Sequence, residues 1–259
     1  MPEAPGLPST RAALVTGGAH RIGRAISLAL AKAGYGVVIH ARRATREASD
    51  LAAQITARGG HAAVVTADLA DHAGVASLVP AAVAAAGALT VLVNNASEFA
   101  ADEVGSLDRA QWDRQFAVNL RTPVFLAEAF AAQAPRGEDA CIINITDQRA
   151  FKIIPRQFSY TLTKCALHAA TTALAQALAP RVRVNAVAPG PTLPSPRQNA
   201  ATFAKQAAAL PLECGPRPED IAAAVVYLVS ASRVTGETIA VDGGQHIAWK
   251  TPDVWGVEE

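Results

Sequence analysis

Short apolar runs alternate with longer segments of mixed polarity along most of this chain. The runs are continuous and rich in β-branched residues, a pattern typical of strands that are covered on both faces. They occupy Ala12–Thr16, Gly36–His40, Ala62–Thr66, Leu89–Val93, Cys141–Ile145, Val182–Val187 and Thr238–Val241. The segments between them predict helices at Ile22–Ala33, Thr45–Ala57, Asp71–Ala86, Asp108–Gln133, Ser159–Leu178 and Pro218–Ser230. This alternation predicts right-handed crossovers and a doubly wound α/β fold around one parallel sheet of about seven strands.

The same pattern predicts a single domain over residues 11–248, between an N-terminal tail at 1–10 and a C-terminal tail at 249–259. The longest irregular stretch runs over residues 190–217 and is rich in proline around a short helical segment. A long loop that follows a strand in such a fold is usually functional, so we expect it to cover a substrate.

The composition narrows the classes of partner. Of 259 residues, 51% are hydrophobic and 17% charged, which excludes a disordered chain. The formal net charge of +1 gives no indication of nucleic acid or an anionic membrane as a partner. Three widely spaced cysteines fit a reducing compartment. The histidines show no pair at metal-ligand spacing with a third ligand, so we expect no metal.

One uncharged stretch, Ala73–Val93, has the length of a membrane span. Pro80 and Gly87 interrupt it and its end resembles a buried strand, so we interpret it as a helix followed by a strand. Residues 1–10 contain Glu3 and three prolines but no apolar core, so they do not resemble a signal peptide. We therefore expect a cytoplasmic protein without a membrane partner.

The first strand ends in a glycine-rich turn, Thr16-Gly17-Gly18-Ala19-His20-Arg21-Ile22-Gly23, and a helix follows. Glycines allow a sharp turn and a close approach to a pyrophosphate, and a helix N-terminus offers free N–H groups. The strict GxGxxG spacing is absent, so a tight loop without a ligand is the alternative. Its place after the first strand favours dinucleotide binding.

The end of the second strand indicates which dinucleotide binds. An acidic residue there would bind the ribose 2′-hydroxyl of NAD, whereas this chain has Arg42 and Arg43. Guanidinium groups bind phosphate with bidentate geometry, so the sequence predicts NADPH. The alternative is a basic helix start that only contacts water.

Polar and titratable residues that could take part in a reaction follow two further strands and lie on one helix. Asn94-Asn95-Ala96-Ser97 follows the fourth strand, with Phe99 close behind, and Asp147 follows the fifth. Tyr160 and Lys164 stand at i and i+4, one turn apart on one helix face. A tyrosine exchanges protons poorly at neutral pH, and a neighbouring ammonium favours the phenolate.

Taken together, these features resemble the short-chain dehydrogenase/reductase family, whose fold is a single Rossmann domain. The resemblance covers roughly residues 10–248. It is carried by TGGAHRIG, Asp68, Asn94 to Ala96, Asn119, Tyr160 with Lys164, Pro189-Gly190 and Val241-Asp242-Gly243-Gly244.

The resemblance implies hydride transfer to or from a nicotinamide, with Tyr160 exchanging the proton. Lys164 would lower the pKa of Tyr160 and hold the nicotinamide ribose, Asn119 would anchor a water relay, and Asp68 would contact the adenine. Further cofactor contacts are implied at Gly17, Arg21, Ile22, Gly23, Leu69, Asn95, Ala96, Pro189 and Gly190. The family also implies a homotetramer, and we expect the tail with Trp249 and Trp255 to pack on another subunit or cap the pocket.

Two departures from the family pattern resemble its pteridine reductase branch, which includes bacterial dihydromonapterin reductases. Arg21 replaces a glycine of the turn, and Asp147 stands thirteen residues before Tyr160, where a serine is usual. By this resemblance Phe99 would stack on a pterin beside Ser97. Arg21 would contact both cofactor phosphate and substrate, and Asp147 would hydrogen-bond the pterin and act with Tyr160.

The chemistry of a carboxylate at position 147 also favours a pterin over a ketone as substrate. In ketone reduction a serine donates a hydrogen bond to the carbonyl oxygen, which becomes a negatively charged alkoxide. An ionised aspartate would repel that developing negative charge. A carboxylate suits a substrate with N–H donors, such as a pterin. This argument weakens if Asp147 is protonated or if Thr146 supplies the missing hydroxyl. A surface carboxylate in a divergent carbonyl reductase is the alternative interpretation.

Our leading hypothesis is an NADPH-dependent reductase of dihydropterins, with dihydromonapterin, dihydrobiopterin and dihydrofolate as candidate substrates. The second is an NADPH-dependent carbonyl, quinone or 3-ketoacyl reductase of the same family. The third is a catalytically idle NADPH-binding sensor. Asn119, Tyr160 and Lys164 together argue against the sensor, since it has no need of a proton relay.

Overall fold

Within residues 11–195 and 198–251, which the computed structural model describes, seven strands form one parallel sheet in the order β3-β2-β1-β4-β5-β6-β7. This confirms the predicted Rossmann fold. The strands are β1 (Ala12–Val15), β2 (Gly36–Ala41), β3 (Ala62–Thr66), β4 (Leu89–Asn94), β5 (Ala140–Ile145), β6 (Val182–Pro189) and β7 (Thr238–Val241). Each begins or ends within two residues of its predicted bounds.

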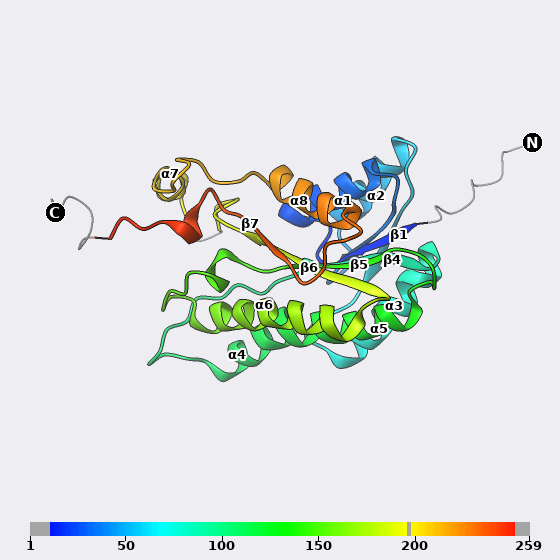
Figure 1. Cartoon of the computed structure of the whole chain (residues 1–259), viewed down its shortest axis with the longest axis horizontal. Coiled ribbons are helices and arrows are strands. Elements are labelled where there is room, and N and C mark those ends of the chain that lie inside the picture. The colour runs from blue at the N-terminus through cyan, green and yellow to red at the C-terminus, as the bar shows by residue number, and fades with distance from the viewer. Residues whose placement is uncertain (1–10, 196–197, 252–259) are drawn as a thin grey trace, which may run out of the picture.

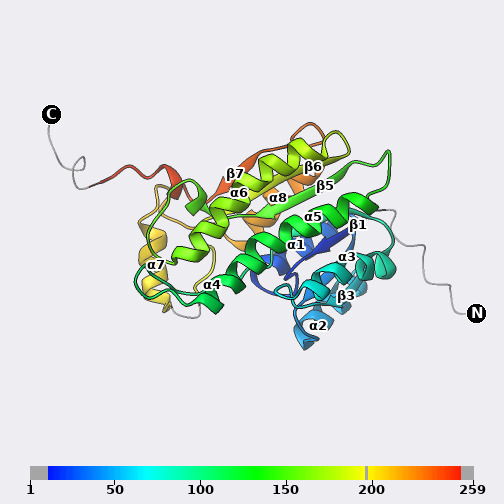
Figure 2. The same ribbon diagram turned by 90° about the horizontal axis from the view of Figure 1, so that it is seen from below.

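Helices cover both faces of this sheet. One layer holds α3 (His72–Ala86), α4 (Arg109–Phe116), α5 (Thr122–Gln133) and α6 (Phe158–Leu178), of which α3, α5 and α6 lie side by side in Figure 2. The other layer holds α1 (Arg21–Lys32), α2 (Arg46–Ala57) and α8 (Pro218–Ser230), as Figure 1 shows. A further helix, α7 (Ala200–Ala208), lies in the substrate loop, which is the loop at residues 190–217 that is expected to cover a substrate.

The apolar runs are continuous because each central strand contributes side chains to the core on both faces of the sheet. Leu14 of β1 packs in one cluster with Leu126 and Phe130 of α5. The next residue, Val15, packs in the other cluster with Ile26 of α1 and Val225 of α8. Successive side chains of a strand point to opposite faces, so a central strand needs apolar residues at every position.

The predicted helix Asp108–Gln133 is wrong in one respect, because the structure divides it. A π-helical segment, Ala117–Arg121, separates α4 from α5 and contains the buried Asn119. Pro123 has no N–H to donate to the carbonyl of Asn119 four residues earlier, which accounts for the interrupted α-helical pattern.

The uncharged stretch Ala73–Val93 forms most of α3 and then β4, as predicted. In the part of the chain that is described, no helix is long and apolar enough to cross a bilayer. The described residues also contain no group of three His, Cys, Asp or Glu side chains that could hold a metal. Of the predicted C-terminal tail, Trp249 is 60% exposed, whereas Trp255 and the tail 1–10 lie outside the described residues. The homotetramer stays a prediction.

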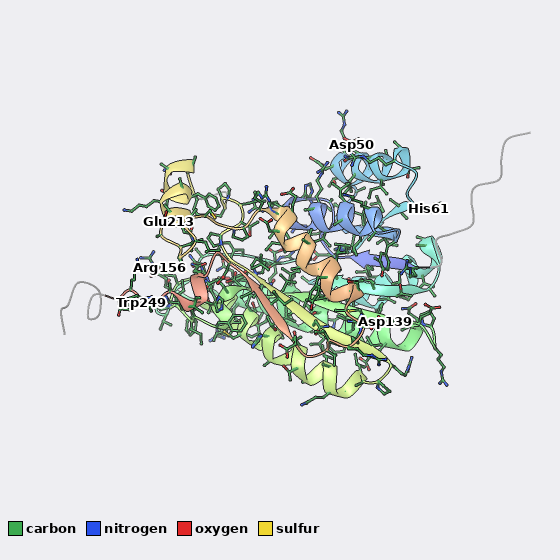
Figure 3. All side chains as sticks on the ribbon, turned by 45° about the horizontal axis from the view of Figure 1, so that its top comes forward. Asp50, His61, Asp139, Arg156, Glu213 and Trp249 are labelled. Atoms are coloured by element: carbon green, nitrogen blue, oxygen red, sulfur yellow. The ribbon has the colours of Figure 1, made fainter. Side chains whose placement is uncertain are left out.

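At the end of the sheet opposite the substrate loop, one arginine joins three elements. Arg183, near the start of β6, forms a bidentate pair with Asp139 at 2.7 and 3.1 Å. It also donates to the carbonyls of Leu228 and Val229 in the last turn of α8, each at 2.8 Å. Carbonyls at a helix end lack partners within the helix, so Arg183 satisfies them. Figure 3 places Asp139 far from Trp249 and Arg156.

We expect Arg183→Met to lower the free energy of unfolding by about 2–4 kcal/mol, because buried carbonyls lose their donor. Asp139→Asn is the matched control. Its carboxylate is about half exposed, so we expect a loss of about 1 kcal/mol or less. Urea denaturation followed by circular dichroism measures both values. Equal losses for the two variants would contradict the role of Arg183 at the end of α8.

Candidate active site

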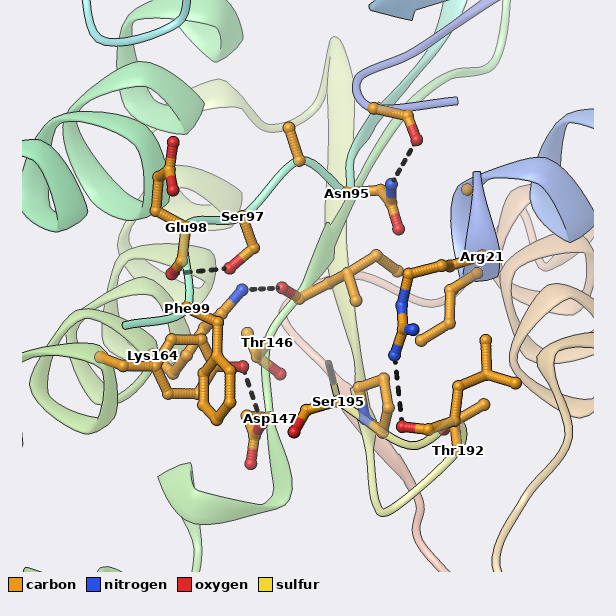
Figure 4. Close-up of a pocket in the computed structure, with 18 of the residues that line it drawn as sticks. Arg21, Asn95, Ser97, Glu98, Phe99, Thr146, Asp147, Lys164, Thr192 and Ser195 are labelled. Carbon is orange, nitrogen blue, oxygen red and sulfur yellow. Dashed lines mark hydrogen bonds between the residues drawn. The ribbon is translucent and has the colours of Figure 1, made fainter. Parts of the chain in front are cut away.

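The carboxyl ends of the central strands surround a cavity of about 890 Å³. It lies beside the adjacent ends of β1 and β4, where the strand order reverses direction along the sheet. Parallel α/β sheets bind ligands at this position. Figure 4 shows the cavity with Phe99, Asp147 and Lys164 on one side and Arg21 on the other.

The hydroxyl of Thr16 holds the two sides of this crevice together. It donates to the carbonyl of Val93 in β4 at 3.2 Å. It accepts from the N–H groups of Asn95 at 2.9 Å and of Ala96 at 3.0 Å. A hydroxyl offers one donor and two acceptor positions, so this buried group is fully used. The ends of β1 and β4 are thereby fixed relative to each other.

The glycine-rich turn leaves no room for larger side chains where it approaches the crevice. A Cβ at Gly23 would stand 2.2 Å from the carbonyl oxygen of Gly17, which itself has φ +60°. Arg21 also adopts the left-handed region, with φ 51°. That conformation suits the glycine usual in the family, so the arginine side chain costs about 1–2 kcal/mol of backbone strain.

A buried histidine supports the turn from the neighbouring strand. His40, in β2, accepts from the N–H of Gly17 through Nδ1 at 3.1 Å. Its Nε2 is 3.0 Å from the carbonyl of Ala67, beyond β3. One ring nitrogen must accept and the other donate, which requires neutral imidazole with the proton on Nε2. Burial lowers the pKa of His40, in keeping with this form.

Four charged residues meet at the end of the cavity beside β2 and β3. Arg42, Asp68, Glu98 and Arg114 all line it, whereas Arg43 does not. Arg114 contacts Glu98 at 2.9 Å and Asp68 at 3.4 Å. A backbone N–H from Ala70 and the Arg114 guanidinium lower the pKa of Asp68. This end of the cavity therefore combines two cations with two anions.

At the other end, Asp147 and Tyr160 form a direct pair. The Tyr160 hydroxyl donates to a carboxylate oxygen of Asp147 at 2.8 Å. Lys164, one helical turn further on, is buried and donates to the carbonyl of Ile145 at 2.7 Å, with its Nζ 5.7 Å from the centre of the Tyr160 ring. The hydroxyl of Thr146 donates to the carbonyl of Val187 at 3.1 Å, so it does not replace the missing serine.

Burial changes the proton affinities of this group. It raises the pKa of Asp147, and burial together with the Asp147 charge raises the pKa of Tyr160 well above its usual value. Burial lowers the pKa of Lys164 to about 8. The charges that act on Tyr160 in this arrangement are those of Asp147 and Arg149, and the acidifying effect expected of Lys164 stays a prediction. Asp147 and Tyr160 retain protons at neutral pH more readily than free side chains do.

The ring of Phe99 packs against Tyr160 of this pair, and the two rings form an aromatic wall of the cavity. The ring of Phe99 meets that of Tyr160 edge to face, with centroids 4.7 Å apart. The Phe99 side chain is 39% exposed although it lines the cavity. The guanidinium of Arg149 lies 5.8 Å from the Phe99 ring and 5.7 Å from the Tyr160 ring. Its charge lowers the pKa of Asp147, partly opposing the effect of burial.

Asn119 does not line the cavity but holds its wall in place. Its Oδ1 accepts from the N–H of Glu98 at 2.8 Å and from the Ser97 hydroxyl at 3.2 Å. Its Nδ2 donates to the carbonyl of Glu98 at 2.9 Å and to Thr163 of α6 at 3.1 Å. The segment that carries Phe99 is thus fastened to the helix that carries Tyr160. The water relay expected of Asn119 stays a prediction.

Arg21 closes the cavity on the side of the substrate loop. Its guanidinium donates to the carbonyls of Leu193 and Pro194 at 3.2 and 3.1 Å. The loop around it supplies amide side chains to the cavity, including Gln198 and Gln206, which are hydrogen-bonded to each other at 2.9 Å. Arg21 therefore joins the glycine-rich turn to the loop expected to cover a substrate.

The cavity brings together most of the site residues predicted from the sequence. These are Gly17, Arg21, Ile22, Gly23, Arg42, Asp68, Leu69, Asn95, Ala96, Ser97, Phe99, Asp147, Tyr160, Lys164, Pro189 and Gly190. The predictions missed His40, Arg114 and Arg149 as lining residues. A polar residue inside an apolar strand could have indicated His40, and proximity to Asp147 could have indicated Arg149. Arg114 has no such signal, because its partners lie on other elements.

The residues at this cavity fit a phosphorylated dinucleotide. The N-terminus of α1 has no side-chain cap and no acidic residue in its first turn, and His20, Ile22 and Gly23 line the cavity there. Free N–H groups and the helix dipole favour an anion at this point. Arg42 supplies a further cation where a 2′-phosphate is expected.

Comparison with known proteins agrees with this arrangement. Residues 17–246 match the enoyl-(acyl carrier protein) reductase family. The crystal structure of FolM alternative dihydrofolate reductase 1 from Brucella canis, complexed with NADP, is 50% identical. It covers 95% of this chain and 98% of that one, with a TM-score of 0.92. The corresponding structure from Brucella suis, also with NADP, is 50% identical over 96% of this chain and 100% of that one, with the same TM-score of 0.92.

A more distant relative is the 3-oxoacyl-[acyl-carrier-protein] reductase FabG of Staphylococcus aureus, 31% identical over 92% of this chain and 99% of its own length. Dihydrofolate contains a dihydropterin ring, so the Brucella matches confirm the predicted resemblance to the pterin-reducing branch. The family match, these relatives and the sheet topology agree that the chain belongs to the short-chain dehydrogenase/reductase family.

Proposed function

We propose that this protein is an NADPH-dependent reductase of dihydropterins. The observation that carries the proposal is the 2.8 Å hydrogen bond from Tyr160 to Asp147 in a buried setting beside Phe99. An aspartate at this position gives the site a second group that can hold a proton. The Brucella proteins, named as alternative dihydrofolate reductases, support the same substrate class.

Reduction of a dihydropterin adds a hydride to carbon and a proton to nitrogen across a ring C=N bond. NADPH supplies the hydride when it is bound. Tyr160 is suited to deliver the proton, since burial and Asp147 keep its hydroxyl protonated. When Asp147 is itself protonated, a state that burial favours by raising its pKa, it can pass that proton to Tyr160 as Tyr160 gives up its own, and so becomes the carboxylate. The substrate nitrogen thus receives a proton without an alkoxide forming beside a carboxylate.

The aromatic wall suits a flat heterocycle. Phe99 exposes part of its ring to the cavity and is held by contact with Tyr160. Aromatic side chains favour offset stacking with planar rings. Ser97 and Arg21 line the same cavity and offer a hydroxyl and a guanidinium to the polar edge of the ring. Dihydrofolate and dihydromonapterin are both candidate substrates of this shape.

The direct test is NADPH oxidation followed at 340 nm with 7,8-dihydromonapterin, 7,8-dihydrobiopterin and dihydrofolate, beside simple ketones, quinones and a 3-ketoacyl thioester. We expect kcat/KM to be at least tenfold higher for one dihydropterin than for any carbonyl substrate. Faster turnover of the carbonyl substrates would instead favour the second hypothesis, and tight NADPH binding without turnover would favour a sensor.

Asp147→Ala should lower kcat/KM for the dihydropterin by about a hundredfold or more, the usual scale for loss of a proton-transfer group. Wild-type kcat/KM should fall as pH rises through the raised pKa of Asp147, because the pair then loses its proton. Asp147→Asn keeps the size of the side chain and should remove that decline. A second decline, as Lys164 deprotonates at about pH 8 in the wild type, should remain in Asp147→Asn but move to lower pH, because the charge of Asp147 raises the pKa of Lys164. An unchanged pH profile in Asp147→Asn would contradict the proposed proton path.

Arg42→Ala should raise the dissociation constant of NADPH by about tenfold, because a phosphate loses a guanidinium partner, and change that of NADH much less. Arg43→Ala is a matched control that removes an equal charge outside the cavity. Calorimetric titration of both variants with both nucleotides measures the effect. An equal loss of affinity for NADPH and NADH would show that Arg42 does not bind the 2′-phosphate.

A further inference from the structure

Two carboxylates line the same end of the cavity as the arginine proposed to bind the 2′-phosphate. Asp68 and Glu98 line the cavity together with Arg42, the guanidinium proposed to bind the 2′-phosphate. Carboxylates in such positions repel phosphate and compete with it for nearby arginines. A site selective for NADPH therefore needs a group that weakens the attraction of both carboxylates for Arg42.

Arg114 occupies the position that meets this need. Its Nε and Nη2 each lie 2.9 Å from the same oxygen of Glu98, and its Nη2 lies 3.4 Å from Asp68. Arg42 also forms an ion pair with that Glu98 oxygen, but a looser one, at 3.8 Å and beyond hydrogen-bonding distance. Glu98 is thus paired with two arginines and is hydrogen-bonded only to Arg114.

We propose that Arg114 determines cofactor selectivity from outside the phosphate site: it holds Glu98 and Asp68, and thereby leaves Arg42 to the 2′-phosphate of NADPH. Arg114 is a positioning residue in this scheme, acting through Arg42. The inference rests on the proposed use of NADPH. Arg114 would thus be a residue that determines cofactor specificity in addition to Arg42, which follows β2.

The backbone around Glu98 does not need Arg114 to hold its place. Asn119 bonds both the N–H and the carbonyl of Glu98, at 2.8 and 2.9 Å. Loss of Arg114 should therefore release the Glu98 carboxylate without displacing the segment that carries Phe99. The released carboxylate can turn to Arg42, and the expected effect is electrostatic. It should be specific to the phosphorylated cofactor and should weaken as salt is added.

The test is calorimetric titration of the full chain with NADP⁺, NAD⁺, 2′,5′-ADP and 5′-AMP at low and high salt. Arg114→Met should raise the dissociation constants of NADP⁺ and 2′,5′-ADP by about tenfold at low salt, and those of NAD⁺ and 5′-AMP by less than twofold. Arg109→Met, which removes an exposed arginine from the same helix outside the cavity, should leave all four values unchanged.

The double variant Arg114→Met/Glu98→Gln separates the proposal from a structural role. Neutral glutamine cannot compete for Arg42, so affinity for NADP⁺ should return to within about threefold of wild type. Failure of this rescue, or equal losses for NADP⁺ and NAD⁺, would overturn the proposal. A wild-type protein that binds NAD⁺ as tightly as NADP⁺ would instead refute the proposed use of NADPH itself.

Discussion

The hydroxyl of Thr16 is the constraint on which the site depends, because it joins two strands that the sheet order brings together from distant parts of the chain. Its bonds to Val93, Asn95 and Ala96 fix the end of β4 against the glycine-rich turn. The turn is the segment proposed to bind the cofactor, and the segment after β4 carries Phe99, proposed to contact the substrate. One satisfied buried group thus sets the separation between the two halves of the site.

The reaction end of the cavity is organised around one anion and two cations. Asp147 lies within hydrogen-bonding distance of Tyr160, while Arg149 and Lys164 approach the Tyr160 ring from other directions. With serine in place of Asp147 the site would hold only positive charge and would suit a developing alkoxide. With aspartate the charges are closer to balance, and the raised pKa of Asp147 suits the proposed transfer of a proton to a substrate nitrogen.

The sequence predicted the sheet and most of the cavity because both depend on local patterns. Apolar runs such as Leu89–Val93 fix buried strands, and parallel strands place their carboxyl ends at one edge, which brings Gly17, Ser97 and Asp147 together. The π-helical segment depends on the missing N–H of Pro123, a single-residue effect within a longer helical pattern. The role of Arg114 depends on side chains 16 and 46 residues away in sequence, which no local pattern could relate.

His40 connects the glycine-rich turn to Ala67, the residue that follows the partly exposed edge strand β3, because one ring nitrogen accepts a hydrogen bond and the other donates one. Protonation would turn the acceptor into a donor facing the N–H of Gly17. As pH falls below about 6.5, the unfolded chain takes up a proton that the buried ring resists, so stability is lost with increasing acidity. The glycine-rich turn therefore has an acid limit of its own, set by the tautomer of one imidazole and separate from the ionisation of the groups that move protons in the reaction.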